Sequence, residues 1–273
     1  MLKVLIREWQ AKIALVFFFM YTALWLYLQY LHKTDSTLYH FFGITYCFMA
    51  LWGGIWGMFI AHKWGGQKSI MGKSLIFFSF GLFAQTYGQI TYSLYAIILK
   101  IELPYPSIGD IGFFGSIPLY IIGMLYLAQA AGVSISLRSF RNKLQAVLLP
   151  LLLLGFSYYI FLRNYQVDLS QPLVVFLDFG YPLGQSIYIS IALLTFILLK
   201  GLLGGRMKNR ILFILFALVL QYLSDFMFLY QATNQEWAVA GLNDYMYFVS
   251  YMVMVLSIIQ FKTVYNELKL RSN

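Results

Sequence analysis

Long apolar stretches alternate with short polar stretches along the whole chain. The apolar stretches are about 18–25 residues long, the length at which an α-helix crosses a lipid bilayer. The pattern predicts eight spans, at residues 13–31, 40–62, 74–99, 111–132, 144–162, 173–199, 211–233 and 245–261. We therefore expect an all-α, polytopic transmembrane helix bundle that forms one domain over residues 1–273.

Composition and charge support this prediction. Hydrophobic residues make up 61% of the chain and charged residues only 11%, whereas roughly a quarter of the residues in a soluble domain are charged. The net charge is +9, but the basic residues lie in short loops and form no continuous patch. This distribution favours a lipid bilayer as the partner and argues against nucleic acid.

The basic residues also predict the orientation. Most of the 19 Lys and Arg residues lie at the two termini and in the loops after the second, fourth and sixth spans. Only Lys33, Lys100 and Arg163 fall on the other side. Because Lys and Arg are enriched in cytoplasmic loops, we expect both termini to be cytoplasmic; the resemblance given below implies that the membrane is the inner (cytoplasmic) one.

The two halves of the chain, residues 1–137 and 138–273, have matching positions. A shift of 136 residues aligns Gln85 with Gln221 and Gln89 with Asp225. With two residues fewer, Asp110 aligns with Asp244, Phe114 with Phe248 and Ser116 with Ser250. Gly65–Gly66 and Gly204–Gly205 precede basic residues in both halves. The pattern favours a duplication of four spans with parallel copies; chance similarity of two apolar hairpins is the alternative.

Polar side chains recur inside the apolar stretches at helical spacing. Gln85 and Gln89 are four residues apart, as are Gln221 and Asp225, so each pair shares one helix face. Polar groups at membrane depth usually face the bundle interior or a wet cavity. The predicted ligand-binding residues of an outward-facing pocket are Asp178, Gln185, Gln85, Gln89, Gln221, Asp225 and Tyr181, with Asp110 and Asp244 at the rim. The alternative is interhelical hydrogen bonding, at about 0.6 kcal/mol per contact.

Signs of catalysis, metal binding or a cofactor are missing from the sequence. The histidines, His32, His40 and His62, have no Cys or carboxylate at ligand spacing. The chain contains no phosphate-binding glycine loop, nucleophile elbow or HExxH motif. We therefore expect a protein that is not an enzyme and that holds neither metal nor cofactor.

Three short motifs resemble a known family. The segment PYPSIGDIGFFGSIPLYIIG at 104–123, the segment LDFGYPLGQ at 177–185, and Ser224–Asp225 followed by Asp244 are similar to motifs of multi-span sensor regions. In bacteria these regions precede GGDEF-type diguanylate cyclase domains. The chain departs from the family pattern at Gly109 and Gln185, usually Ala and Asp, and no catalytic domain follows the eighth span.

The resemblance implies a bacterial sensor whose output comes from a cytoplasmic signalling partner, or a fragment or stand-alone relative of such a sensor. Together with the polar residues, it predicts a non-catalytic, receptor-like membrane module that binds a small ligand. A small-molecule transporter and a membrane scaffold subunit are the alternatives. Parallel repeats are a transporter feature, but the cytoplasmic halves of the spans at 74–99, 173–199 and 211–233 are almost entirely apolar.

Overall fold

The computed structural model describes residues 8–31, 37–99, 101, 104–132, 140–159, 167–198, 206–233 and 236–272. Within these ranges the chain is helical and contains no strand. The helices are α2 (Trp9–Leu31), α3 (Thr37–Thr45), α4 (Phe48–Lys63), α5 (Ile70–Ser93), α6 (Gly109–Ala130), α7 (Phe140–Ser157), α8 (Pro172–Leu198), α9 (Arg206–Thr233) and α10 (Leu242–Ser272). A 3₁₀ turn, η1 (Gly66–Lys68), precedes α5, and a π-helical turn, η2 (Leu94–Leu99), follows it. The all-α prediction is confirmed for this part of the chain.

Six described segments are long and apolar enough to cross a membrane: Trp9–Tyr30, Thr37–Lys63, Gly109–Ala130, Pro172–Ile197, Arg210–Phe228 and Leu242–Glu267. They correspond to six of the eight predicted spans. The other two predictions, 74–99 and 144–162, correspond to α5 and α7. Gly, Ser, Thr and Gln residues lower the hydropathy of α5, and within the described residues of α7 the apolar segment is Val147–Phe156. Residues 160–162 of the predicted span lie outside the described residues. By length and composition, the chain is a helical membrane protein.

Two helix boundaries differ from the expected spans. The stretch at 40–62 is divided by a turn at Tyr46 and Cys47 into α3 and α4. The last helix does not end near residue 261, because α10 continues through the polar segment to Ser272. The residues Lys33, Lys100 and Arg163 and the Gly204–Gly205 pair lie outside the described residues.

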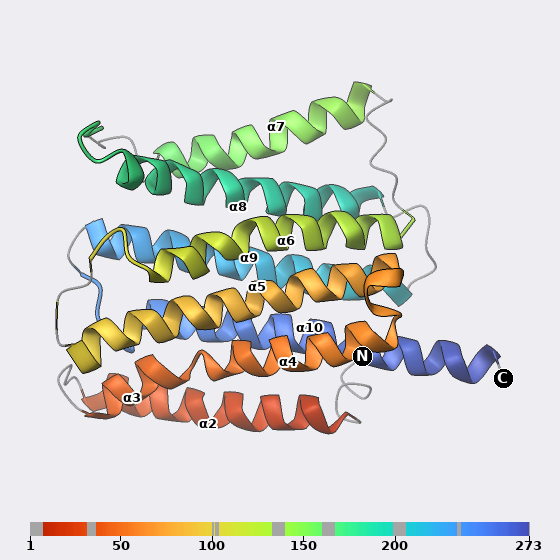
Figure 1. The fold of residues 1–273 in the computed structure, drawn as a ribbon, viewed down its shortest axis with the longest axis horizontal. Coiled ribbons are helices and arrows are strands. Elements are labelled where there is room, and N and C mark those ends of the chain that lie inside the picture. Colours follow the sequence, from red (N-terminus) through yellow and green to blue (C-terminus); the bar gives the residue numbers. More distant parts are fainter. Residues whose placement is uncertain are drawn as a thin grey trace.

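The helices run side by side in one elongated bundle (Figure 1). From one edge of the view to the other, their order is α7, α8, α6, α9, α5, α10, α4 and α2. Helices that overlap in this projection are not all packed together. In the contacts, α5 packs on α6 and α4, α9 packs on α10 and α8, α10 packs on α4, and α6 packs on α8, so these six helices form a ring. The contacts also repeat along the chain. The contacts of α4 with α5, of α5 with α6 and of α6 with α8 recur as contacts of α8 with α9, of α9 with α10 and of α10 with α4.

The two ends of the bundle carry opposite charge. The helix α2 begins and α10 ends at one end (Figure 1), which we call the terminal end. The described Lys and Arg residues lie toward this end, among them Lys12, Lys63, Lys68, Lys73 and Lys262. At the opposite end, α6, α8 and α10 begin, with Asp110, Asp168, Asp178, Glu236 and Asp244 in or beside their first turns. We call this the acidic end.

Glycines allow α4 to approach its two neighbours closely. A Cβ atom on Gly57 would lie 2.2 Å from Oγ of Ser79 on α5, and one on Gly53 would lie 2.4 Å from Cγ2 of Val255 on α10. Small residues at such positions are typical of helix contacts in membranes, where van der Waals packing replaces the hydrophobic driving force. The close contacts hold α4, α5 and α10 together as the centre of the bundle.

Candidate functional site

A hydrogen-bonded cluster surrounds Asp225 near the acidic end of α9. The hydroxyl of Tyr247 on α10 donates to Oδ1 of Asp225 at 2.5 Å, and the amide of Gln185 on α8 donates to Oδ2. The amide of Gln221, one turn earlier on α9, lies 3.3 and 3.4 Å from the two carboxylate oxygens. Three helices thus point neutral donors at one carboxylate, which we call the Asp225 cluster.

The partners of Asp225 are more deeply buried residues than Asp225 as a whole. Gln185 and Gln221 are each 3% exposed, whereas Asp225 is partly exposed. Among the described residues, no Lys, Arg or His forms an ion pair with Asp225; Lys262 and Glu8 form the one ion pair found there. The cluster therefore holds an acidic group within an apolar bundle, supplied with hydrogen-bond donors but with no compensating positive charge.

A related contact joins α5 and α6. The Gln85 amide donates to Oγ of Ser116 at 2.7 Å, and in the second half Oγ of Ser250 donates to Oε1 of Gln221 at 3.0 Å. The residues that the sequence shift aligns therefore form the same Gln–Ser pair in both halves. The hydroxyl of Tyr251 on α10 donates to Oε1 of Gln85 at 3.0 Å, and its ring stacks on that of Tyr247, 6.2 Å away. These two tyrosines connect the Gln85 pair with the Asp225 cluster.

Gln89 and Asp225 are aligned by the shift but have different partners. The amide of Gln89 donates to the backbone oxygen of Gly43 on α3 at 3.0 Å. Gln89 therefore ties α5 to α3 and lies outside the Asp225 cluster. An amide suits that contact because it can donate to a carbonyl oxygen, whereas an ionised carboxylate only accepts hydrogen bonds.

Two predicted carboxylates accept tyrosine hydrogen bonds at the acidic end. Oδ1 of Asp110 accepts from the Tyr181 hydroxyl at 2.7 Å, and its Oδ2 accepts from the backbone N–H of Ser107 at 2.7 Å, which closes the first turn of α6. Oδ1 of Asp178 accepts from the Tyr105 hydroxyl at 2.6 Å. The segment that precedes α6 is therefore fastened to the first turns of α8.

Asp244 stabilises the start of α10. Its Oδ2 accepts from the backbone N–H of Ala240 at 2.7 Å, and Ala240 has a positive φ of 57°. The carbonyl oxygen of Ala240 accepts from Trp25 at 3.0 Å and from Gln29 at 2.9 Å, both on α2. Asp110 and Asp244 thus have matching roles, because each accepts a backbone N–H at the start of its helix.

Asp168, in the turn before α8, is an exposed carboxylate of this end. It accepts hydrogen bonds from the side chain and the backbone N–H of Ser170, at 2.6 and 2.9 Å. These bonds favour the charged form and lower the pKa of Asp168 below its ordinary value. Asp168 therefore has its own local partners and is separate from the Asp225 cluster.

The structure gathers only part of the predicted pocket in one place. Gln185, Gln221 and Asp225 share one cluster, and Gln85 adjoins it through Tyr251. Asp178 and Gln185 lie about 10 Å apart along α8 at 1.5 Å per residue, and they have different partners. The remaining predicted residues, Gln89, Asp110, Tyr181 and Asp244, form separate contacts at the acidic end.

Several residues of the cluster were not predicted from the sequence. Tyr247 and Tyr251 are two of 22 tyrosines and carry no distinguishing spacing. Ser116 and Ser250 were aligned by the repeat, and that alignment was the available signal for their shared role. Tyr188, on α8, is 1% exposed, and its hydroxyl has no hydrogen-bond partner within the described residues.

No protein-family model, no curated protein and no solved structure matches this chain. The function must therefore be inferred from the cluster itself. The described residues contain no group of three or more His, Cys, Asp or Glu side chains that could hold a metal ion. The arrangement offers one accessible acidic group, neutral amide and phenol donors, and aromatic walls. Such a site can bind and orient a small ligand.

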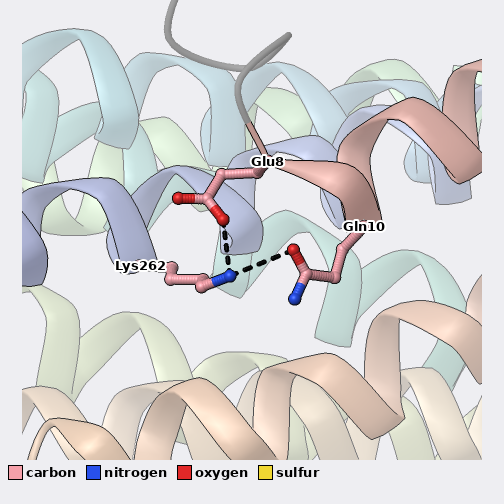
Figure 2. A network of polar contacts seen from close by, with 3 residues as sticks. All are labelled: Glu8, Gln10 and Lys262. Atoms are coloured by element: carbon pink, nitrogen blue, oxygen red, sulfur yellow. Dashed lines mark hydrogen bonds and ion pairs between the residues drawn. The ribbon is translucent and has the colours of Figure 1, made fainter.

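The terminal end of α10 is held by a second polar contact (Figure 2). Nζ of Lys262 lies 2.5 Å from Oε2 of Glu8 and 3.1 Å from Oε1 of Gln10, both beside the start of α2. The Trp64 indole N–H donates to the backbone oxygen of Phe261 at 3.1 Å. The same helix therefore contributes Tyr247 to the Asp225 cluster and Lys262 to this clamp, about 22 Å apart along its axis.

Proposed function

We propose that the protein is a non-catalytic, receptor-like module of the inner membrane. It binds a small ligand at the Asp225 cluster and transmits binding through α10 to the terminal end, where a cytoplasmic partner responds. The chain crosses the membrane eight times as two related halves, with both termini in the cytoplasm. The opposite charges of the two bundle ends support this orientation, since basic residues collect on the cytoplasmic side.

The observation that carries the proposal is the unneutralised carboxylate of Asp225. Placing an ionised Asp at the centre of a membrane helix costs about 2.5–3.5 kcal/mol on insertion scales. Asp225 lies closer to the end of its helix, about 12 Å along the axis from Thr233, but its partners are still buried. Ionisable residues in such places are usually functional, and the three donors around Asp225 fix its orientation.

The contacts across the bundle favour a receptor over a transporter. Toward the terminal end, α9 presents buried apolar side chains at Ile211, Ile214, Leu215 and Leu218. The buried hydroxyls of Ser190, Thr195 and Ser257 donate to carbonyl oxygens of their own helices. Because these hydroxyls are used within their own helices, the arrangement favours binding at one side of the membrane over passage across it.

The experiment measures binding and transmission in the same preparation. The purified protein and its Asp225→Asn variant are screened for thermal stabilisation by a panel of cationic, anionic and neutral small molecules. A ligand that binds the folded state raises the melting temperature in proportion to its affinity. We expect at least one compound to stabilise the native protein and to lose its effect in the variant.

Transmission is followed with spin labels at Lys12→Cys and Leu270→Cys, two exposed positions at the terminal end. The receptor hypothesis expects the distance distribution between them to change when the stabilising ligand is added. A ligand that binds without changing this distribution and is accumulated by proteoliposomes would establish a transporter instead. If no compound distinguishes the native protein from Asp225→Asn, the binding site is disproved.

A further inference from the structure

We infer that the Asp225 cluster binds an organic ammonium group, either a protonated amine or a quaternary ammonium. The inference rests on the proposed function and assigns the chemical class of its ligand. Three features carry it: a carboxylate without a basic partner, a buried phenol without a hydrogen-bond partner, and aromatic rings around both.

The charge of the site selects a cation. All the hydrogen bonds that Asp225 accepts come from neutral groups, the Tyr247 hydroxyl and the amides of Gln185 and Gln221. Neutral donors orient the carboxyl group but supply no positive charge to balance its ionised form. A charge removed from water without a counterion is unfavourable. A ligand with one positive charge would supply the missing counterion, whereas an anionic ligand would be repelled.

The unpartnered hydroxyl marks a position for the ligand beside the carboxylate. Tyr188 follows Gln185 by three residues, so both side chains lie on the same face of α8. Tyr188 is 1% exposed, interacts electrostatically with Asp225, and has no hydrogen-bond partner within the described residues. Leaving a buried polar group unsatisfied is unfavourable. A protonated amine whose N–H groups reach the carboxylate and the phenol oxygen would satisfy both, whereas a quaternary ammonium, which has no N–H, would supply only the counterion of the carboxylate.

The aromatic surroundings favour an organic cation over a metal ion. The rings of Tyr120 and Tyr188 meet edge to face, 6.1 Å apart. Tyrosine ring faces attract ammonium groups. A metal ion would instead need several oxygen ligands, and the described residues provide no cluster of three acidic or metal-binding side chains.

Asp225 is partly exposed while its partners are buried, so a ligand would approach the cluster from the side of Asp225. The ammonium can have two sources. It can belong to a soluble amine or to the headgroup of a lipid such as phosphatidylethanolamine. The chemistry at Asp225 is the same in both cases, and the experiment distinguishes them.

The test measures the melting temperature of the protein of residues 1–273 at fixed pH and ionic strength. In detergent, choline chloride and ethanolamine hydrochloride are titrated against sodium chloride. In nanodiscs, phosphatidylglycerol alone is compared with a mixture that contains phosphatidylethanolamine. Stabilisation by the soluble amines identifies a free amine, and stabilisation only by phosphatidylethanolamine identifies a headgroup. We expect Asp225→Asn to abolish either response and Asp168→Asn, at the exposed carboxylate, to leave it unchanged.

Tyr188→Phe separates binding from folding. Because the Tyr188 hydroxyl has no partner within the described residues, its removal should leave the melting temperature without ligand unchanged or slightly higher. We expect the same variant to weaken the response to ethanolamine, whose ammonium carries N–H donors, at least threefold in apparent affinity. Equal stabilisation by sodium chloride, or no ammonium response in any arm, overturns the inference. If a neutral or anionic compound stabilises the protein in an Asp225-dependent way, the proposed function stands and only the ammonium assignment fails.

Discussion

The α5–α6 and α9–α10 hairpins share a framework but differ at the positions that decide their chemistry. Both hold a Gln–Ser pair, and in both a carboxylate accepts a backbone N–H at the start of the second helix. In the first hairpin, Gln89 and Phe113 occupy the positions of Asp225 and Tyr247 under the same sequence shifts. The second hairpin therefore has both the carboxylate and the hydroxyl that donates to it, and the first hairpin has neither.

The two hairpins also pack differently. In the first, Gly88 and Gly112 bring the α5 and α6 backbones together; a Cβ atom on Gly112 would lie 2.4 Å from the carbonyl oxygen of Ala84. The equivalent residues in the second hairpin are Ser224 and Met246. The carbonyl oxygen of Ser224 accepts a hydrogen bond from Asn243 at 2.7 Å. The comparison shows one hairpin built for close packing and the other for polar contacts around Asp225.

The largest expected effect on stability comes from filling the close contact of the first hairpin. Gly112→Ala should lower the free energy of unfolding by about 1–3 kcal/mol, because the added methyl group meets backbone atoms that cannot move independently. Met246→Ala at the equivalent position should cost less. Gly115→Ala, where no atom lies within 4 Å of the added Cβ, is the control and should not destabilise the protein. Unfolding in mixed micelles measures all three.

Removing the hydroxyl that binds Asp225 should have the next largest effect. We expect Tyr247→Phe to lower the free energy of unfolding by about 1–2 kcal/mol, the range for hydrogen bonds to charged groups and for strong contacts within membranes. Tyr230, an exposed tyrosine near the end of α9, provides the control. Tyr230→Phe should leave the free energy of unfolding unchanged in the same assay. Equal losses in the two variants would mean that the Asp225 contact contributes nothing.

The clamp at the terminal end should contribute less. A double-mutant cycle with Glu8→Gln and Lys262→Met should give a coupling energy of about 0.5–1 kcal/mol, since the side chains are 15% and 14% exposed and remain partly screened by water. The coupling should fall as salt concentration rises. A coupling energy of zero at low salt would contradict the ion pair.

The exposed carboxylate of Asp168 should have the smallest effect on stability. Asp168→Asn removes a carboxylate whose hydrogen bonds to Ser170 are exposed to water. We expect no measurable change in melting temperature at neutral pH. A clear loss would show that the segment before α8 contributes more to the fold than its exposure indicates.

Helix positions could be predicted from the sequence, because apolar length alone decides whether a segment spans a bilayer. The turn at Tyr46 and Cys47 could not, since no proline or charge interrupts the apolar stretch there. Gln221 and Asp225 were correctly placed on one face by their spacing. Tyr247 could not be found, because its role depends on how α9 and α10 pack. For the same reason the spacing of Asp178 and Gln185 could not show that the two residues have different partners.

The most direct test converts the second hairpin to the residues of the first. The double variant Asp225→Gln, Tyr247→Phe places in α9 and α10 the residue types that α5 and α6 already accommodate, so the protein should remain folded. Choline chloride, ethanolamine hydrochloride and phosphatidylethanolamine nanodiscs are then compared on the native and variant proteins by melting temperature. The account predicts that the ammonium response of the native protein disappears in the variant. A variant that remains folded and keeps the full response would contradict it.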